Sequence, residues 1–169
     1  TYLSASVTGK ERDKTAMDIK REGIDFLKAP CHFYYPEFDN EDDFCDFLIN
    51  ELEEKIIEIG PENIMAFIAE PILASGGVIV PPKNYNYRCW EVVKRYNIIY
   101  IADEVVTAFG RLGYWFASEH VFGIIPDIII FAKGITSGYI PMGGYAVSEK
   151  FMSTFSGDDA DGCLYSNGY

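Results

Sequence analysis

The sequence predicts an α/β fold, with a mostly parallel sheet and flanking helices. Apolar runs of strand length recur at 64–69, 98–102 and 127–131, and helix-like patterns precede or separate them. Each run is short and bounded by turn residues or charges, which is typical of a buried strand. Alternation of strands with helices favours parallel pairing through right-handed crossovers.

The segment before the first helix pattern is polar. Residues 1–40 show no regular periodicity, apart from one aromatic patch at 32–35. Pro30 and Pro36 bracket that patch and disfavour a helix there, because proline lacks a donor and clashes with the preceding turn. We therefore expect residues 1–40 to be irregular.

Residues 41–59 predict an amphipathic helix. Asn40 suits the N-cap, and the acidic first turn complements the helix dipole. Gly60 and Pro61 end the pattern. Apolar positions of this segment share one side: Phe44, Phe47, Leu48, Leu52, Ile56 and Ile59.

The next elements alternate. The first strand is followed by a Gly- and Pro-rich loop at 74–82 and by a helix pattern at 85–96. Trp90, Val92 and Val93 are expected to face inward in that helix. After the second strand comes a stretch interrupted by glycines, for which no regular element is predicted.

Two of the strands stop at residues able to do chemistry. Asp103 follows the run 98–102, Lys133 follows the run 127–131, and a short further strand is expected at 144–147. Ligands of open parallel sheets bind past the carboxyl ends of the strands, so Asp103 and Lys133 should face one crevice. An amine can form a Schiff base with an aldehyde, and a carboxylate can hold a protonated pyridine nitrogen. The pair thus predicts pyridoxal 5′-phosphate (PLP) as cofactor.

Simpler interpretations of the same residues exist. Lys133 could be a solvated lysine at a strand end, although the apolar run before it places it near the edge of the interior. Asp103 could cap the turn that follows it. A nucleotide-binding doubly wound domain would also fit the strand pattern, but the chain lacks Walker-type and Rossmann-type glycine spacing.

Three motifs carry a family resemblance. They are Ala69–Gly77 (AEPILASGG), Asp103–Gly113 (DEVVTAFGRLG) and Ala132–Gly143 (AKGITSGYIPMG), with Pro126-Asp127 between the last two. In this order they resemble class III (ornithine/omega-amino-acid) PLP-dependent aminotransferases, and the resemblance covers nearly the whole chain. One departure is Ala108, where the family usually has glycine.

The resemblance implies roles for four residues. Lys133 would carry the Schiff base and shuttle the proton, and Asp103 would keep the pyridine nitrogen protonated. Val105 would pack on the cofactor ring, and Glu70 would lie close to the active site. The predicted catalytic residues are therefore Lys133 and Asp103, and the predicted cofactor-binding residues are Lys133, Asp103, Val105 and Glu70.

The implied reaction is transfer of an amino group from an amine or omega-amino acid to a 2-oxo acid. Other class III chemistry, an aminomutase or a dialkylglycine-type decarboxylase, stays open, as does an inactive fragment that serves only as a scaffold. Where glutamate-handling members often place a second glutamate, in the loop of Ser75, this chain has Ser or Ala. The resemblance therefore favours the omega-amino-acid and amine branch over the ornithine and 4-aminobutyrate branches. Glu104 and Arg111 follow the family pattern, and we expect them to be structural, in a turn and an ion-pair network.

The resemblance also implies an incomplete domain. Residues 1–169 would be the central part of the PLP-binding large domain of the aspartate aminotransferase-like fold, without the N-terminal segment and the small C-terminal domain. The full-length parent would be a homodimer, and the fragment alone would bind PLP poorly.

Composition narrows the partners. The formal net charge is −12, from 26 acidic and 14 basic residues, which argues against nucleic-acid or anionic-membrane binding. No apolar run reaches the length of a membrane span, and no signal peptide is visible. The 4 cysteines and 2 histidines match no metal-binding spacing, so no metal is expected and the thiols are interpreted as free. Free thiols favour a reducing compartment, and we expect a cytoplasmic protein.

Overall fold

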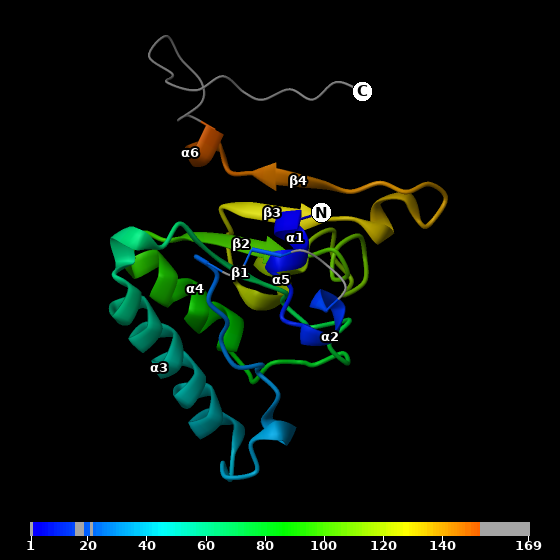
Figure 1. The fold of residues 1–169 in the computed structure, drawn as a ribbon. Helices are drawn as coiled ribbons and strands as arrows, with labels where there is room; N and C mark the ends of the chain where they lie inside the picture. Colours follow the sequence, from blue (N-terminus) through cyan, green and yellow to red (C-terminus); the bar gives the residue numbers. More distant parts are fainter. Residues whose placement is uncertain (1, 16–18, 21, 153–169) are drawn as a thin grey trace.

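The computed structural model describes residues 2–15, 19–20 and 22–152, and one sheet organises them (Figure 1). The strand order is β1-β2-β3-β4, with β1, β2 and β3 parallel and β4 antiparallel to β3. The strands are β1 (Ala66–Ala69), β2 (Ile99–Asp103), β3 (Ile128–Phe131) and β4 (Gly144–Val147). The predicted mostly parallel α/β fold is confirmed.

Two long helices lie beside this sheet, and shorter ones fill the connections. The α-helices are α1 (Tyr2–Ser6), α2 (Glu11–Lys14), α3 (Glu41–Ile59), α4 (Tyr85–Arg95), α5 (Ala117–Phe122) and α6 (Glu149–Met152). Single 3-10 turns are η1 (His32–Tyr34), η2 (Pro61–Asn63) and η3 (Lys133–Thr136). The expectation of an irregular segment at 1–40 was wrong for α1, α2 and η1, and α5 was not predicted. Helices this short contain too few residues for an apolar period to be recognised in the sequence.

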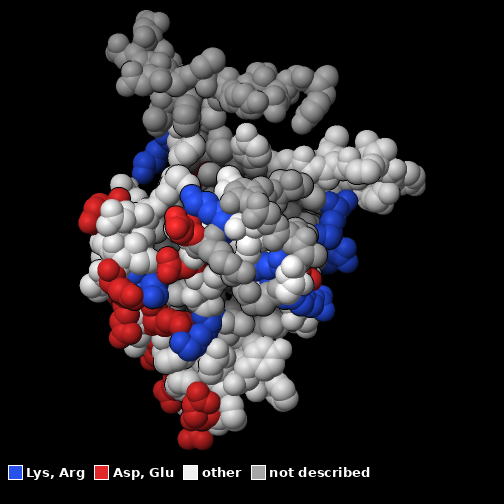
Figure 2. Space-filling view, in the orientation of Figure 1, with Lys and Arg blue, Asp and Glu red and all other residues white. Residues whose placement is uncertain are grey.

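Helix α3 has the predicted bounds because its caps are encoded locally. The side chain of Asn40 accepts a hydrogen bond of 2.9 Å from the Asp43 N–H, and Gly60, with φ 86°, donates its N–H to the Ile56 carbonyl at 3.0 Å. Acidic side chains gather on the solvent side of α3, at the lower left of Figure 2. The buried face is Phe44, Cys45, Leu48, Ile49, Leu52 and Ile56. The predicted members Phe47 and Ile59 are only half-buried.

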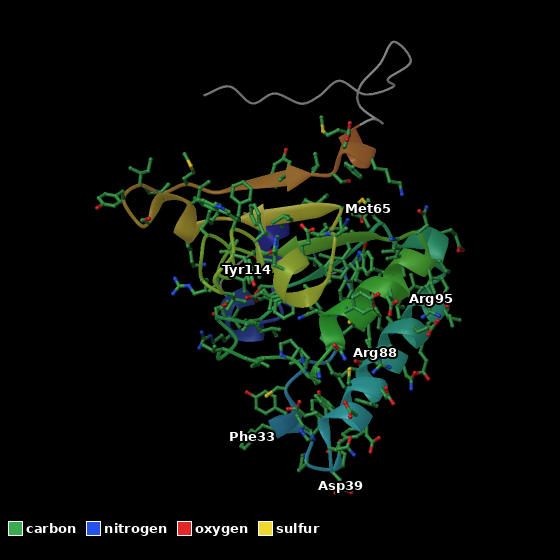
Figure 3. All side chains as sticks on the ribbon, turned by 180° about the vertical axis from the view of Figure 1, so that it is seen from behind. Phe33, Asp39, Met65, Arg88, Arg95 and Tyr114 are labelled. Carbon is green, nitrogen blue, oxygen red and sulfur yellow. The ribbon has the colours of Figure 1, made fainter. Side chains whose placement is uncertain are left out.

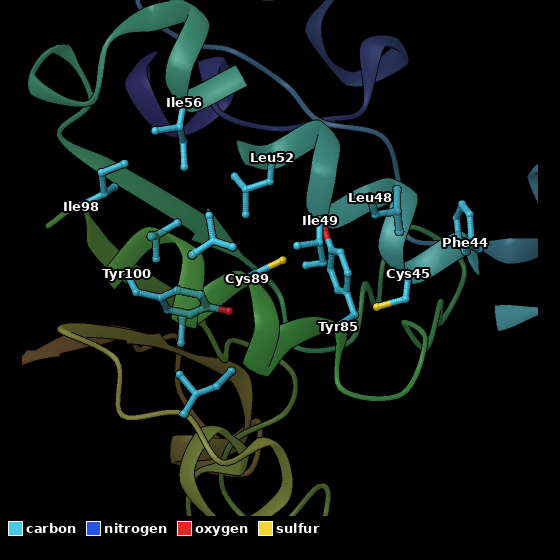
Figure 4. Packing of buried hydrophobic residues seen from close by; sticks show 14 residues of the cluster. Phe44, Cys45, Leu48, Ile49, Leu52, Ile56, Tyr85, Cys89, Ile98 and Tyr100 are labelled. Carbon is cyan, nitrogen blue, oxygen red and sulfur yellow. The ribbon is translucent and has the colours of Figure 1, made fainter. Parts of the chain in front are cut away.

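The hydrophobic core lies between α3, α4 and one face of the sheet (Figure 4). Strand β2 contributes Tyr100 and Ala102, which are 2% and 1% exposed, and α4 contributes Val92 and Val93. Trp90 was expected inward but is half-buried, because its indole N–H donates to the Ile125 carbonyl at the surface. The core therefore anchors the middle strand of the parallel set from one side.

Strand alternation decides where Asp103 points. Tyr100 and Ala102 face the core, and successive side chains of a strand point to opposite faces. Ile101 and Asp103 thus lie on the other face from α3 and α4. The parallel strands end together, so Asp103 stands at the rim of the sheet on the face that this core leaves open.

Candidate active site

The carboxyl ends of the parallel strands bring the predicted residues to one rim. Glu70 directly follows β1, Asp103 ends β2, and Lys133 begins η3 just past β3. In the register of β1 and β2, Ala69 is paired with Ala102, and neighbouring strands lie about 4.8 Å apart. The residues that follow this pair, Glu70 and Asp103, therefore lie side by side. In Figure 3, Tyr114 marks the loops at this end of the sheet and Met65 marks the opposite end.

The pKa of Glu70 is influenced by the other charged residues at this rim. Its half-buried carboxylate accepts a hydrogen bond of 3.0 Å from the Ala74 N–H. Burial raises the pKa of Glu70 above its ordinary value, while the Ala74 N–H works in the opposite direction. The negative charge of Asp103 raises this pKa further, and the positive charges of Lys10 and Lys133 lower it. Glu70, Asp103 and Lys133 therefore act on one another, and Lys10 is a neighbour that sequence reasoning missed.

The two carboxylate oxygens of Asp103 differ in their hydrogen bonding. Its Oδ1 accepts the Val105 N–H at 3.0 Å, which is the turn cap that the simpler interpretation expected. Its Oδ2 has no hydrogen-bond partner among the residues that the structure describes. One oxygen thus fixes the carboxylate, and the other remains able to accept a proton donor. Val105 is half-buried beside it.

Lys133 stands on a left-handed turn. Its φ is 47°, a conformation that costs a non-glycine residue on the order of 1–3 kcal/mol and that gathers at functional sites. Its side chain is exposed, and its amine has no hydrogen bond or ion pair within the described part of the chain. The expectation that Lys133 sits at the edge of the interior was wrong: the chain leaves β3 at Phe131, and Lys133, which begins η3, is exposed.

Glu104 is structural, but not as an ion pair. It is 0% exposed, and its carboxylate accepts hydrogen bonds from Thr107, Ala117 and Ser118, none of them cationic. Within the described residues the predicted ion-pair network is therefore wrong at Glu104. Arg111 does lie in a turn, where the Gly113 N–H donates to the Gly110 carbonyl at 3.1 Å, and it is exposed.

Ala108 fits where the resemblance leads one to expect glycine. It is buried, and it is not among the residues with positive φ. Positive φ angles in this loop belong to Phe109, at 55°, and to Gly110 and Gly113. Alanine therefore needs no backbone strain here.

The residues of the rim fit PLP. An unpartnered amine at Lys133 suits the aldehyde, and the open Oδ2 of Asp103 suits a protonated ring nitrogen. Two hollows, of about 680 Å³ beside α4 and about 650 Å³ beside β3 and β4, are lined by neither of these residues nor by Glu70.

Other kinds of site find little support in the described residues. No group of three or more His, Cys, Asp or Glu side chains there could hold a metal ion. Cys31, Cys45 and Cys89 are free thiols, and Cys163 lies outside the described residues. None of the described helices combines the length and apolarity that crossing a bilayer requires.

Comparison with known proteins gives one consistent result. Residues 1–167 match the family described as aminotransferase class-III. A putrescine–pyruvate aminotransferase of Pseudomonas aeruginosa is 47% identical over 98% of this chain and 37% of its own length. A mitochondrial gamma-aminobutyrate transaminase of rice is 40% identical over 98% of this chain and 33% of its own length. The chain thus spans about a third of the length of these relatives.

Solved structures agree. An (S)-enantioselective omega-transaminase from Thermomicrobium roseum superposes with a TM-score of 0.89 at 38% identity, over 98% of this chain and 36% of that one. An omega-transaminase from Pseudomonas jessenii, in complex with PMP, superposes with a TM-score of 0.85 at 38% identity, over 90% of this chain and 34% of that one. The fold implied by the sequence resemblance is confirmed.

Proposed function

We propose, from the premise that this chain belongs to the class III aminotransferase family, that it forms the central part of the PLP-binding large domain of a transaminase. The enzyme would move an amino group from an amine or omega-amino acid to a 2-oxo acid. The observation that carries this proposal is Lys133: an exposed, unpartnered amine on a left-handed turn, on the rim that Asp103 and Glu70 share.

The cofactor, when bound, supplies an aldehyde that condenses with amines and a pyridine ring that draws electrons from the substrate carbon. Nζ of Lys133 would hold it between turnovers, then accept the proton of the substrate carbon and return it. Oδ2 of Asp103 would accept the hydrogen bond of the ring nitrogen and keep that nitrogen charged. Val105 would contact the ring, and Glu70, whose carboxyl holds a proton more readily than usual, would orient neighbouring groups.

The substrate class follows from the relatives and from one loop. The two relatives described above are named for putrescine with pyruvate and for gamma-aminobutyrate. Ser75, exposed in the loop after Glu70, offers no carboxylate to pair with an arginine. We propose a diamine or monoamine donor such as putrescine, with pyruvate as the 2-oxo acid.

Assembly and location are part of the proposal. Several large apolar side chains near β4 stay exposed, among them Tyr139 at 90% and Tyr145 at 73%, and apolar patches of this kind mark protein interfaces. They support a homodimer of the full-length protein. The free thiols support a cytoplasmic location.

The first test is chemical trapping. The protein is mixed with PLP, reduced with borohydride and mapped by peptide mass. A single label on Lys133 is expected, lost in Lys133→Arg and kept in Lys83→Arg, which changes another exposed lysine. Labels scattered over surface lysines in the full-length protein would contradict the proposal. A label that appears only in the full-length protein, and not in residues 1–169, would assign the activity to the longer chain.

The second test is turnover. Putrescine and gamma-aminobutyrate are offered with pyruvate, and alanine is measured. Alanine from putrescine exceeding that from gamma-aminobutyrate is expected. Release of carbon dioxide, or product without any 2-oxo acid, would point to the decarboxylase or aminomutase chemistry instead.

A further inference from the structure

The carboxylate of Glu104, the residue next to Asp103, is fully hydrogen-bonded, unlike that of Asp103. The carboxylate of Glu104 accepts hydrogen bonds from Thr107 Oγ1 at 3.1 Å, Ala117 N at 2.7 Å, Ser118 N at 2.9 Å and Ser118 Oγ at 2.6 Å. A fully buried carboxylate is costly unless its oxygens are satisfied, and here neutral donors satisfy both. Glu104 therefore ties together the two ends of the loop 105–116.

The same residue is bonded to the strand that leads to Lys133. The Glu104 N–H donates to the Ile130 carbonyl of β3 at 2.9 Å, and its own carbonyl accepts from the Ala108 N–H at 3.1 Å. The loop then closes on itself, because the Phe109 N–H donates to the Trp115 carbonyl at 2.7 Å. The hydrogen bonds of the Glu104 main chain and side chain thus hold the loop in place. They thereby set the position of Phe109, from which the loop closes.

Phe109 touches the chain on both sides of Lys133. Its ring meets the ring of Phe131 edge-on, with centroids 5.7 Å apart and planes at 83°. A Cβ placed on Gly134 would lie 3.0 Å from the Cβ of Phe109, so a larger residue there would force the turn of Lys133 and Phe109 apart. The loop held by Glu104 is therefore the surface on which that turn rests.

We propose that Glu104 is a positioning residue, which sets the turn of Lys133 relative to Asp103 through the contact of Phe109 with Phe131 and Gly134. This inference rests on the proposed function, since it concerns where the cofactor-bearing amine stands. Glu104 itself touches no reacting atom. Small displacements of a reacting group are costly, about 100-fold for a shift near 1 Å, so an indirect residue can have a large effect.

The test compares two neutralised carboxylates in the full-length protein. Glu104→Gln keeps the shape but turns an amide NH₂ toward backbone N–H groups. Asp127→Ala removes a carboxylate whose Oδ2 accepts the Tyr100 N–H at 2.9 Å, at the other end of the strands. The thermal midpoint of the cofactor-free protein, the PLP dissociation constant and the yield of borohydride trapping on Lys133 are measured for both.

We expect Glu104→Gln to weaken PLP binding by about 10- to 100-fold and to lower trapping on Lys133, while Asp127→Ala lowers the midpoint with less than about a twofold change in binding. Equal changes in binding for the two variants, or wild-type binding in a folded Glu104→Gln, would overturn the inference. If Glu104→Gln does not fold, Phe109→Ala leaves the four hydrogen bonds of Glu104 in place and should lose trapping on Lys133. Full trapping in Phe109→Ala would likewise overturn it. Absence of trapping in the unmodified protein would instead overturn the proposed function and this inference with it.

Discussion

The two ends of the parallel strands differ in backbone conformation and in hydrogen bonding. At the amino end, Asp127 accepts the Tyr100 N–H and donates its own N–H to the Tyr100 carbonyl, so the start of β3 is locked to β2. At the carboxyl end, Phe109 and Lys133 hold positive φ angles, and the Lys133 amine is exposed. At the amino end the positive φ before β2 falls on Asn97, and asparagine tolerates it. At the carboxyl end it falls on Phe109 and Lys133, beside an amine that has no partner among the described residues. The regular end and the core therefore hold the strands in place, while the other end holds the residues that we propose for the chemistry.

The largest effect should come from the lysine itself. Lys133→Gly removes the amine, so trapping of PLP at this position is abolished and turnover falls by about 10²- to 10⁴-fold. Glycine also relieves the left-handed backbone, so the free energy of unfolding should stay equal or rise by about 1 kcal/mol. Denaturant unfolding and an alanine-formation assay measure the two effects. Lys133→Ala, which lacks the amine and keeps the strain, is the matched control.

A loss of stability in Lys133→Gly, along with the loss of activity, would contradict this difference between the two ends. In that case the turn would be held by the lysine side chain rather than strained around it, and the two ends of the strands would not differ in the way described.

The next effect lies in the core and should leave chemistry alone. Leu52, 4% exposed on α3, packs in the cluster around Tyr100 (Figure 4). Leu52→Ala should lower the free energy of unfolding by about 2–5 kcal/mol through lost burial and a cavity. Turnover per folded molecule should be unchanged. A fall in turnover larger than the loss of folded protein would show that the core, too, sets the geometry of the active rim.

These differences also explain which features could be predicted from the sequence. The bounds of α3 were predicted because Asn40 and Gly60 act within a few residues of the helix ends. Asp103 and Lys133 could be placed at one rim because strand ends in parallel sheets share a side. Local signals and simple topology were sufficient for both.

The remaining features depend on contacts that no local pattern displays. Glu104 is satisfied by Ala117 and Ser118, far along the chain and uncharged, so nothing in the sequence marked them as partners. The exposure of Lys133 depends on the φ of one residue, and Lys10 reaches the rim from a segment without periodicity. The individual duties of Lys133, Asp103, Val105 and Glu70 toward a cofactor stay predictions.

A smaller effect should come from the close approach at Gly134. Gly134→Ala places a Cβ 3.0 Å from that of Phe109, and overpacking of this kind costs about 1–3 kcal/mol. The double variant with Phe109→Gly, which removes the Cβ that the new alanine meets, should recover about 0.5 kcal/mol or more of that loss, as measured by a denaturant double-mutant cycle. Gly9→Ala, which meets nothing within 4 Å, is the control and should be close to neutral. Additive losses in the cycle would mean that the two residues do not support one another.

The smallest effect is a pH dependence at Glu70. Its folded-state pKa is raised, mainly by burial, above the ordinary value of 4.5, so the folded protein holds this proton more tightly than the unfolded chain. The stability that Glu70 contributes is therefore full at pH values below the unfolded pKa and is lost as pH rises through the folded pKa. Glu70→Gln keeps an oxygen for the Ala74 N–H and removes the titration.

The thermal midpoint, followed from about pH 4 to pH 8, should therefore fall less with rising pH in Glu70→Gln than in the unmodified protein. The difference should be smaller than the loss caused by Gly134→Ala, because Glu70 is only half-buried and solvent screens part of its charge. Asp103 sharpens the measurement, since its negative charge is one cause of the raised pKa. In an Asp103→Asn background the pH dependence due to Glu70 should shrink. A dependence that stays the same would show that burial of Glu70 alone sets it, and that the two carboxylates do not share one electrostatic neighbourhood.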